Sequence, residues 1–238
     1  ATIAVELAKK GKKVHLTTTD PANHIGNVID ESFGITISNI DEEEELRKYG
    51  EEVLSKAREA NASQDDIDYI EEDLRSPCTQ EIAVFRAFAD IVERSEDEVV
   101  VIDTAPTGHT LLLLESTESY DKEISRTQGE TPESVKKLLP KLKDDKFTEV
   151  LIVALPEATP YYEAKRLQDD LDRADIFSKW WLVNSSFYAT ETTNEILKAK
   201  ASNEVEWINT IDKESKGNFA VIKWTPEELK GEQLAALL

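Results

Sequence analysis

A chain of 238 residues with 39% hydrophobic content is long enough to bury one sizeable core, so we expect one domain with insertions. The 49 acidic and 28 basic residues give a net charge of −21, which repels nucleic-acid phosphates and anionic lipid headgroups. No apolar run approaches the roughly 20 residues that span a bilayer, and the single cysteine excludes an internal disulfide framework. These features argue against nucleic-acid binding and direct membrane insertion, and they favour the reducing cytoplasm.

The chain opens with what reads as the second half of a βαβ unit. Apolar residues with helical spacing run from Ala1 to Ala8, Gly11 ends the helix, and Val14–Thr18 has the composition of a buried strand. A βαβ unit needs a strand and a loop before its helix. We therefore expect the first strand and a phosphate-binding loop upstream of Ala1, since residues 1–10 have the pattern of the helix that such a loop would open. No G-x-x-x-x-G-K-[ST] pattern occurs within the 238 residues, and its absence says little about the molecule.

Two polar segments interrupt the strands that follow. Residues 41–97 are mostly helical in pattern and begin with the acidic run DEEEE, which is typical of a solvated helix start. Residues 116–147 are rich in charge and contain Gly129, Pro132 and Pro140. We expect both segments to form helical subdomain inserts in a single domain that spans residues 1–238.

Short apolar segments alternate with helical ones along the rest of the chain. The predicted strands are Val14–Thr18, Val99–Ile102, Val150–Ala154, Trp181–Val183 and Phe219–Ile222. Helices are predicted between them, for example over Ala158–Ala174 and Thr192–Asp212. This alternation predicts an α/β fold with a doubly wound, mostly parallel, twisted sheet flanked by helices.

Two carboxylates follow predicted strands. Asp103 comes directly after VVVI, and Asp20 lies in TTTDPANH after the strand Val14–Thr18. Ligands on open α/β sheets bind at the carboxyl ends of the strands, so both residues point to a phosphate-handling site. Asp103 suits a Mg²⁺-associated acid, and Asp20 suits a group that orients or deprotonates an attacking water. Each also has a plain structural interpretation: Asp103 as a turn cap, and Asp20 with Pro21 as a turn.

Three stretches carry a resemblance to a known family. They are TTTDPANHIG (17–26), EEDLRSPCTQEIAVFRAF (71–88) and VIDTAPTGHTLLLLE (101–115). They resemble motifs of the arsenical pump-driving ATPases and of their relatives, the tail-anchored-protein targeting ATPases, both of the deviant-Walker P-loop class. The second stretch is most similar to the second of the two homologous halves in the long form of the arsenical enzyme. LIVALPEATPYYEAKRLQDDL and WWLVNSS continue the resemblance over nearly the whole chain.

The resemblance implies roles for five residues of a nucleotide site with ATP and Mg²⁺. Asp20 resembles the aspartate that positions the hydrolytic water, and Asp103 resembles the Mg²⁺-linked aspartate. Asn184 matches an asparagine that hydrogen-bonds adenine. Thr225 and Pro226 resemble, less closely, the loop that closes over the base. The phosphate-binding lysines of the family are expected upstream of Ala1.

Cys78 and His109 match metalloid ligands at the subunit or half-molecule interface of the family. Trivalent arsenic and antimony are soft and favour thiolate, with imidazole as a tolerable partner. Thr79, just before the apolar helix EIAVFRAF, would place Cys78 near a positive helix N-terminus that favours thiolate. Taken alone, the cysteine also reads as a buried small hydrophobe and the histidine as a turn residue. A single sulfur is a poor metalloid site, so either a second copy or a homologous half supplies further ligands, or metalloid binds weakly or not at all.

The function implied by the resemblance is Mg²⁺-ATP hydrolysis that energises arsenite or antimonite export through a membrane permease, with metalloid-stimulated ATPase activity. It implies a homodimer or a pseudo-dimer with a homologous half, located in the cytoplasm and peripherally membrane-associated through the permease. The alternative is an ATP-dependent targeting chaperone for tail-anchored membrane proteins. That class usually needs a C-x-x-C zinc site, which this sequence lacks, and an apolar groove, for which residues 116–147 are too charged. A partitioning or metal-insertion ATPase is a third reading, against which RSPC and APTGHT argue.

Overall fold

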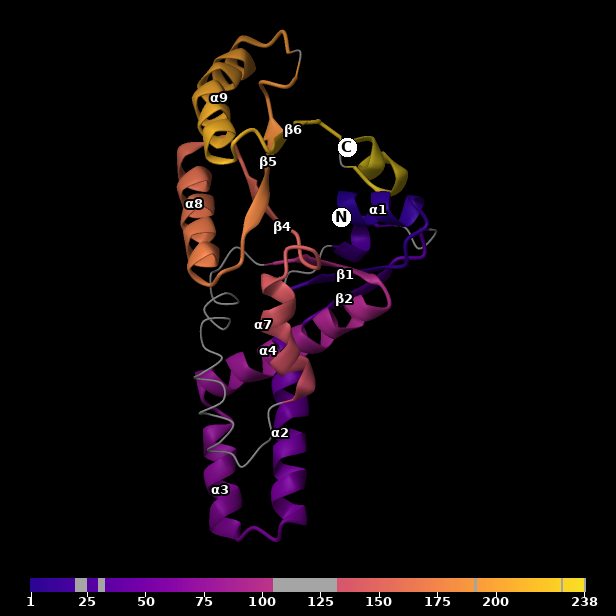
Figure 1. Ribbon diagram of the computed structural model, residues 1–238, viewed down its shortest axis with the longest axis vertical. Helices are drawn as coiled ribbons and strands as arrows, with labels where there is room; N and C mark the ends of the chain where they lie inside the picture. The colour runs from indigo at the N-terminus through magenta and orange to yellow at the C-terminus, as the bar shows by residue number, and fades with distance from the viewer. Residues whose placement is uncertain (20–24, 30–32, 105–131, 191, 228, 238) are drawn as a thin grey trace. The chain divides into compact units, whose positions relative to one another are not determined.

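The computed structural model describes residues 1–19, 25–29, 33–104, 132–190, 192–227 and 229–237 (Figure 1). The chain divides into two compact units: Ala1 with Ile3–Pro140, and Thr2 with Lys141–Leu238. Each unit contains a parallel three-stranded sheet, with strand orders β2-β1-β3 and β4-β5-β6. The predicted α/β class with parallel strands and flanking helices is confirmed. Within the described residues, no helix is both long and apolar enough to cross a bilayer.

The sheet of the first unit is centred on β1 (Val14–Thr18), which is buried along its whole length. It pairs in parallel with β2 (Thr36–Asn39) and with β3 (Val99–Asp103). Strands β1 and β3 lie where the sequence predicts them. Strand β2 was not predicted, because three of its four residues are exposed and its pairing with β1, rather than an apolar run, makes it a strand.

Helix α1 (Thr2–Lys9) precedes this sheet, as the sequence predicts. Its residues Ala4 and Val5 are completely buried. Gly11 then adopts a φ of +76°, in the left-handed region that glycine tolerates best, and the chain turns into β1. A short 3₁₀ turn, η1 (Ile25–Asn27), lies between β1 and β2.

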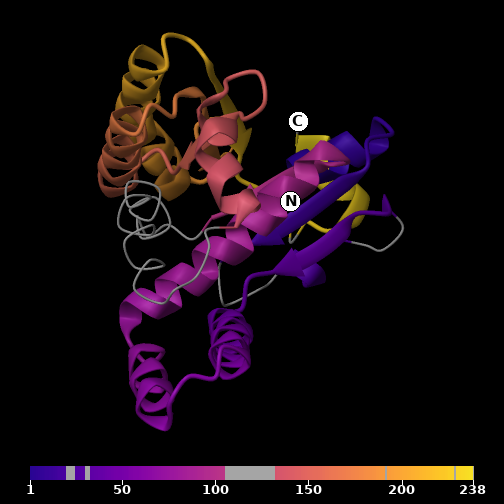
Figure 2. The same ribbon diagram turned by 60° about the horizontal axis from the view of Figure 1, so that its bottom comes forward.

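Three helices connect β2 to β3 in the first unit. They are α2 (Glu42–Glu59), α3 (Gln64–Asp73) and α4 (Pro77–Glu93), and the last runs into the 3₁₀ turn η3 (Arg94–Glu96). In both views α2 and α3 extend side by side away from the sheet, and α4 leads the chain back to it (Figures 1 and 2). The polar segment that follows β2 therefore places most of its length in helices.

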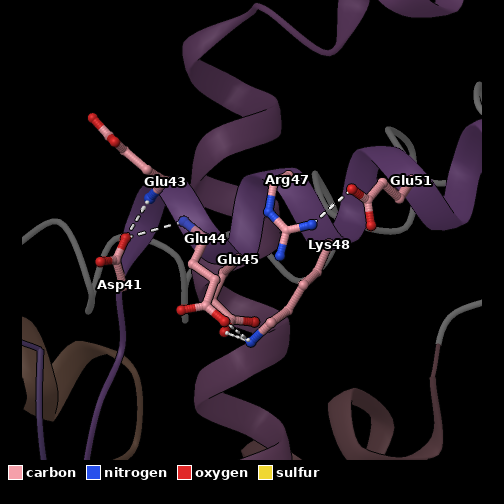
Figure 3. A network of polar contacts seen from close by, with 7 residues as sticks. All are labelled: Asp41, Glu43, Glu44, Glu45, Arg47, Lys48 and Glu51. Atoms are coloured by element: carbon pink, nitrogen blue, oxygen red, sulfur yellow. Dashed lines mark hydrogen bonds and ion pairs between the residues drawn. The ribbon is translucent and has the colours of Figure 1, made fainter.

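The acidic run is a helix start, as its pattern predicts. The Asp41 carboxylate accepts the backbone N–H groups of Glu43 and Glu44, both at 3.0 Å (Figure 3). Lys48, one turn further on, forms ion pairs with Glu44 at 3.0 Å and Glu45 at 2.7 Å (Figure 3). Acidic side chains at this end complement the positive N-terminus of α2, so the run needs no ligand to explain it.

Helix α4 begins earlier than the sequence prediction placed it. The Ser76 hydroxyl accepts the backbone N–H of Thr79 at 3.2 Å, and Pro77 occupies the first turn. Proline fits there because its absent N–H has no helical partner to lose. The expectation that Thr79 precedes the helix was wrong, and the backbone of Cys78 lies within the first turn.

A buried polar network connects the strands of the first unit. His15 is 1% exposed, and its Nδ1 lies 3.3 Å from Glu98 Oε1. Its Nε2 lies 2.8 Å from the hydroxyl of Ser38, which donates to the Thr17 hydroxyl at 3.0 Å. Lys13 Nζ adds an ion pair to Glu98 Oε2 at 3.4 Å. These polar groups therefore have hydrogen-bond or ion-pair partners at buried positions of the sheet.

Helix α7 (Glu133–Lys143) contains the boundary between the two units. It buries Val135 and Leu138, each 1% exposed, and carries Pro140 in its interior. Proline lacks the N–H that the preceding turn would accept, so it weakens a helix at that point. The division between the units falls directly after Pro140.

The second unit repeats the alternation of strands and helices. Its elements are β4 (Val150–Ala154), α8 (Ala158–Arg173), β5 (Ser178–Ser186), α9 (Glu195–Glu214), β6 (Phe219–Lys223) and the 3₁₀ helix η4 (Gly231–Leu237). Helices α8 and α9 lie side by side along this sheet (Figure 1). The predicted helix over Thr192–Asp212 begins later, because the Asn194 side chain caps α9 by accepting the N–H groups of Ile196 and Leu197.

Aromatic side chains fill the space between these helices and β5. Trp181 is 1% exposed, and its ring centroid lies 6.1 Å from that of Tyr161 on α8. The Tyr161 ring in turn lies 5.7 Å from that of Trp207 on α9. Large buried aromatic rings supply much of the free energy of folding in a small core.

One lysine joins the two helices electrostatically. Lys165 Nζ on α8 lies 2.7 Å from Asp169 one turn away and 2.7 Å from Glu214 on α9. Burial acts to lower the pKa of Lys165, but the hydrogen bonds and charges of these two carboxylates outweigh it and raise that pKa above its ordinary value. The pair with Glu214 thus supports the packing of α8 against α9.

Candidate functional site

The carboxyl ends of the strands in the first unit meet at one edge of the sheet. The register places Thr18 of β1 opposite both Asn39 of β2 and Asp103 of β3. Beyond the strand, the N–H of Thr19 donates to the carbonyl of Asp103 at 3.1 Å. Thr18 and Thr19 are buried, whereas Asp103 is exposed. The edge therefore presents an accessible carboxylate on a backbone held by a buried strand.

The charge of Asp103 acts at Ala1, the residue directly before α1. The exposed N–H groups at a helix start carry partial positive charge and favour anions. Asp103 has the chemistry to bind a hard cation, and the start of α1 has the chemistry to bind an anion.

Asp20 directly follows Thr19, the last described residue at this edge of the sheet. Thr19 is held to the Asp103 backbone, and Asp20 follows it directly in the sequence. Asp20 itself lies outside the described residues, so its predicted role beside Asp103 stays a prediction.

The second unit has a cavity of about 550 Å³ at the carboxyl ends of β5 and β6. Its lining residues are Ala189, Thr190, Thr192, Leu197, Lys223, Trp224, Thr225 and Pro226. They combine an aromatic ring and aliphatic groups with hydroxyls and one ammonium group. A cavity of this size and mixed chemistry suits a small planar ligand with polar edges.

The side of this cavity formed by Trp224, called here the Trp224 wall, is supported by neighbouring residues. Its ring stacks on Phe187, with centroids 5.0 Å apart and planes 26° apart. The ammonium group of Lys200 lies 5.1 Å from the centre of the Phe187 ring and 2.9 Å from the Glu157 carboxylate. The backbone N–H of Trp224 donates to the carbonyl of Ser186 at 2.9 Å. This wall therefore has both stacking and hydrogen-bond support.

The residues predicted to contact the base fall in two places. Thr225 and Pro226 line the cavity. Asn184 lies in β5, half-buried, and is not one of the lining residues. Sequence reasoning overlooked Trp224, which comes one residue after β6, whereas Asp103 is the last residue of β3. A search of the residues around each strand end, the rule that singled out Asp103, would also have found it.

Comparison with known proteins places the chain in a family. A family model for the Anion-transporting ATPase matches residues 1–130 and 127–237, which is nearly the whole chain. The chain belongs to the anion-transporting ATPase family. The predicted resemblance to the arsenical pump-driving ATPases is thereby confirmed by the relatives that follow.

Two relatives of this family carry the same name. The arsenical pump-driving ATPase of Escherichia coli is 40% identical over 233 residues, which cover 97% of this chain and 40% of the relative. That of Acidiphilium multivorum is 39% identical over 241 residues, covering 100% of this chain and 41% of the relative. The ATPase get3 of Pyrenophora tritici-repentis is more distant, 22% identical over 280 residues, 97% of this chain and 82% of the relative. The chain thus spans about 40% of the length of its arsenical pump-driving relatives.

Of the two predicted metalloid ligands, the structure describes only the backbone of Cys78. The backbone of Cys78 lies in the first turn of α4, and His109 lies outside the described residues. Among the residues that the structure describes, no group of three or more His, Cys, Asp and Glu side chains is arranged to hold a metal ion. The pairing of Cys78 with His109 stays a prediction.

Proposed function

We propose that this chain is a Mg²⁺-dependent ATP-hydrolysing domain that energises export of arsenite or antimonite through a membrane permease. The observation that carries the proposal is the sheet edge at which Asp103 stands exposed at the end of β3, opposite Thr18 of β1. Membership of the anion-transporting ATPase family and the names of its relatives support it.

In this proposal the first unit handles the triphosphate. The Asp103 carboxylate supplies the hard oxygen donor that Mg²⁺ prefers, and the α1 start favours the negative phosphates. Bound Mg²⁺ would neutralise charge on the phosphate oxygens. Asp20, which follows the buried strand β1, orients the attacking water and accepts its proton.

The second unit handles the base. Trp224 and Pro226 offer flat apolar surfaces to an adenine ring, and the Thr225 hydroxyl offers a polar partner at its edge. Asn184 of β5 would hydrogen-bond the same base, although it is not among the described residues that line the cavity. Among the described lining residues, Lys223 supplies an ammonium group that would favour a ligand with negative charge.

The cargo is the soft ion that the names of the relatives suggest. Cys78 and His109 would bind arsenite or antimonite, with further ligands from a second copy or a homologous half in a dimer or pseudo-dimer. The protein would act on the cytoplasmic side and associate with the membrane through the permease. Metalloid binding would then stimulate ATP hydrolysis by reciprocal coupling between the two sites.

The test is the rate of ATP hydrolysis with and without antimonite, measured for the wild type, His109→Ala and Cys78→Ala. We expect Mg²⁺-dependent hydrolysis in all three proteins and loss of stimulation by antimonite in the two variants. An activation ratio that is unchanged in both variants would defeat the metalloid role. The absence of Mg²⁺-dependent hydrolysis in the wild type would defeat the proposal as a whole.

A targeting chaperone is the second candidate, favoured by the distant similarity to ATPase get3. It would bind an apolar helical peptide in the presence of ATP. Fluorescence anisotropy of a labelled peptide with a tail-anchor sequence distinguishes the two: we expect no saturable binding, and saturable ATP-dependent binding would favour the chaperone.

A further inference from the structure

A buried carboxylate stands behind the cavity of the second unit. Glu204 of α9 is 2% exposed, and its Oε2 accepts the Ser186 hydroxyl at 2.8 Å and the backbone N–H of Tyr188 at 3.0 Å. Its other oxygen, Oε1, has no hydrogen-bond partner among the described residues. The carboxylate is thus buried with half of its acceptor capacity unused.

Such an arrangement costs folding free energy. A buried carboxylate loses its hydration, and an oxygen without a partner recovers none of that loss. An apolar side chain of similar volume at the same place would avoid the cost, as replacements of buried charged groups often do. Core packing therefore does not explain a glutamate at position 204. The role of this residue lies in the two hydrogen bonds that it accepts.

Those two bonds hold the segment that supports the cavity wall. Ser186 and Tyr188 flank Phe187, whose ring stacks on Trp224 at 5.0 Å. The carbonyl of Ser186 also accepts the backbone N–H of Trp224 at 2.9 Å. The Glu204 carboxylate therefore holds the segment that follows β5 directly, through Ser186 and Tyr188. It holds the segment that follows β6 indirectly, because Trp224 is bonded to Ser186.

The held segment is irregular and continues into the cavity. Ser185 has a φ of +54°, a conformation that non-glycine residues rarely adopt, and the pairing of β5 with β6 shifts register between Val183 and Ser186. Ala189 and Thr190, which line the cavity, follow Tyr188 directly. A strained strand end of this kind persists only where its surroundings hold it.

We propose that Glu204 is a positioning residue that sets the distance between Trp224 and the lining residues Ala189 and Thr190, and so determines affinity for the adenine base of ATP. The identity of the ligand rests on the proposed function, whereas the positioning itself rests on the hydrogen bonds. Preorganised walls bind more tightly because binding does not have to order them.

Three variants separate positioning from stability. Glu204→Leu fills the same volume without accepting a hydrogen bond, and Glu204→Gln keeps one oxygen that can accept both. Glu206→Leu removes an exposed carboxylate from the same helix and is the matched control. We expect Glu204→Leu to remain folded and to raise the Kd of a fluorescent ATP analogue and the KM for ATP by about 10-fold, with kcat within about twofold. Glu204→Gln and Glu206→Leu should bind as the wild type does.

A second measurement does not depend on nucleotide. The emission of Trp224, obtained as the difference between each protein and the same protein with Trp224→Phe, should shift to longer wavelength in Glu204→Leu because the ring, 36% exposed in the wild type, becomes more exposed to water. It should not shift in Glu204→Gln. An unshifted Trp224 component, or an unchanged Kd in Glu204→Leu, overturns the inference. If the wild type binds no ATP analogue, the proposed function fails instead, and the Trp224 component alone decides the positioning role.

Discussion

The two units place different chemistry at the same topological position. In the first unit, the carboxyl edge of β2-β1-β3 presents the exposed Asp103. In the second unit, the carboxyl ends of β5 and β6 open onto a cavity lined by Trp224 and by three threonines, Thr190, Thr192 and Thr225. The edge of a parallel sheet is a general place for ligands, and the residues that follow each strand decide which part of a ligand it suits.

The buried polar groups of the two units differ in their position relative to the candidate site of each unit. His15 pairs in register with Val100, three residues before the edge that carries Asp103, and its partner Glu98 precedes β3. Glu204, in contrast, bonds to the segment that leads into the cavity. We therefore expect the first network to affect stability and the second to affect affinity.

The largest effect is expected at the charged edge. Asp103→Asn keeps the size of the side chain but removes the charge that a divalent cation requires, so we expect kcat for ATP hydrolysis to fall by about 100- to 1,000-fold. Steady-state kinetics across a Mg²⁺ titration measures this. The control is Asp97→Asn, an exposed carboxylate before the other end of β3. Equal rates for both variants would remove the first unit from the chemistry.

The next largest effect tests whether the His15 network is structural. Glu98→Ala leaves the buried His15 ring without its carboxylate partner and should lower the free energy of unfolding by about 2 kcal/mol. Urea denaturation measures this, and KM for ATP should stay within about twofold. A large change in KM at unaltered stability would show that the contrast between the two networks is wrong.

The wall of the cavity should affect affinity and leave the chemical step alone. Trp224→Ala removes the stacked ring, so we expect KM for ATP to rise by about 10-fold with kcat within about twofold. Tyr69→Ala, which removes an exposed aromatic ring from α3 of the first unit, should change neither constant. A fall in kcat for Trp224→Ala without a change in KM would contradict the division of roles between the units.

The smallest effect concerns the ion pairs that join α8 to α9. Because the folded pKa of Lys165 is raised above its unfolded value of about 10.4, its contribution is full below that pH and is lost as the pH rises through the folded pKa. Lys165→Met should lower the free energy of unfolding by at most about 1 kcal/mol near neutral pH, since both partners are partly exposed to solvent. Denaturation curves of the two proteins should converge at strongly alkaline pH. A difference that grows with rising pH would contradict the assigned pairs.

Local pattern was enough to predict most of the regular structure. The strands β1, β3, β4 and β6 and the helix α8 lie within a residue of their expected bounds, because apolar runs and helical spacing are properties of neighbouring residues. Strand β2 escaped detection because its residues are mostly exposed and only the partner strand makes it regular. The start of α4 was misjudged because the serine at position 76, rather than the apolar run, determines where the helix begins.

By itself the sequence determined the α/β class, the family resemblance and the position of Asp103 at a strand end, since each depends on a contiguous motif. Only the tertiary structure decided which residues share a site. The cavity joins segments around residues 190 and 225, and Glu204 meets Ser186 across 18 positions. Such contacts depend on how β5, α9 and β6 pack together, because burial and hydrogen bonding act between residues that the chain itself keeps apart.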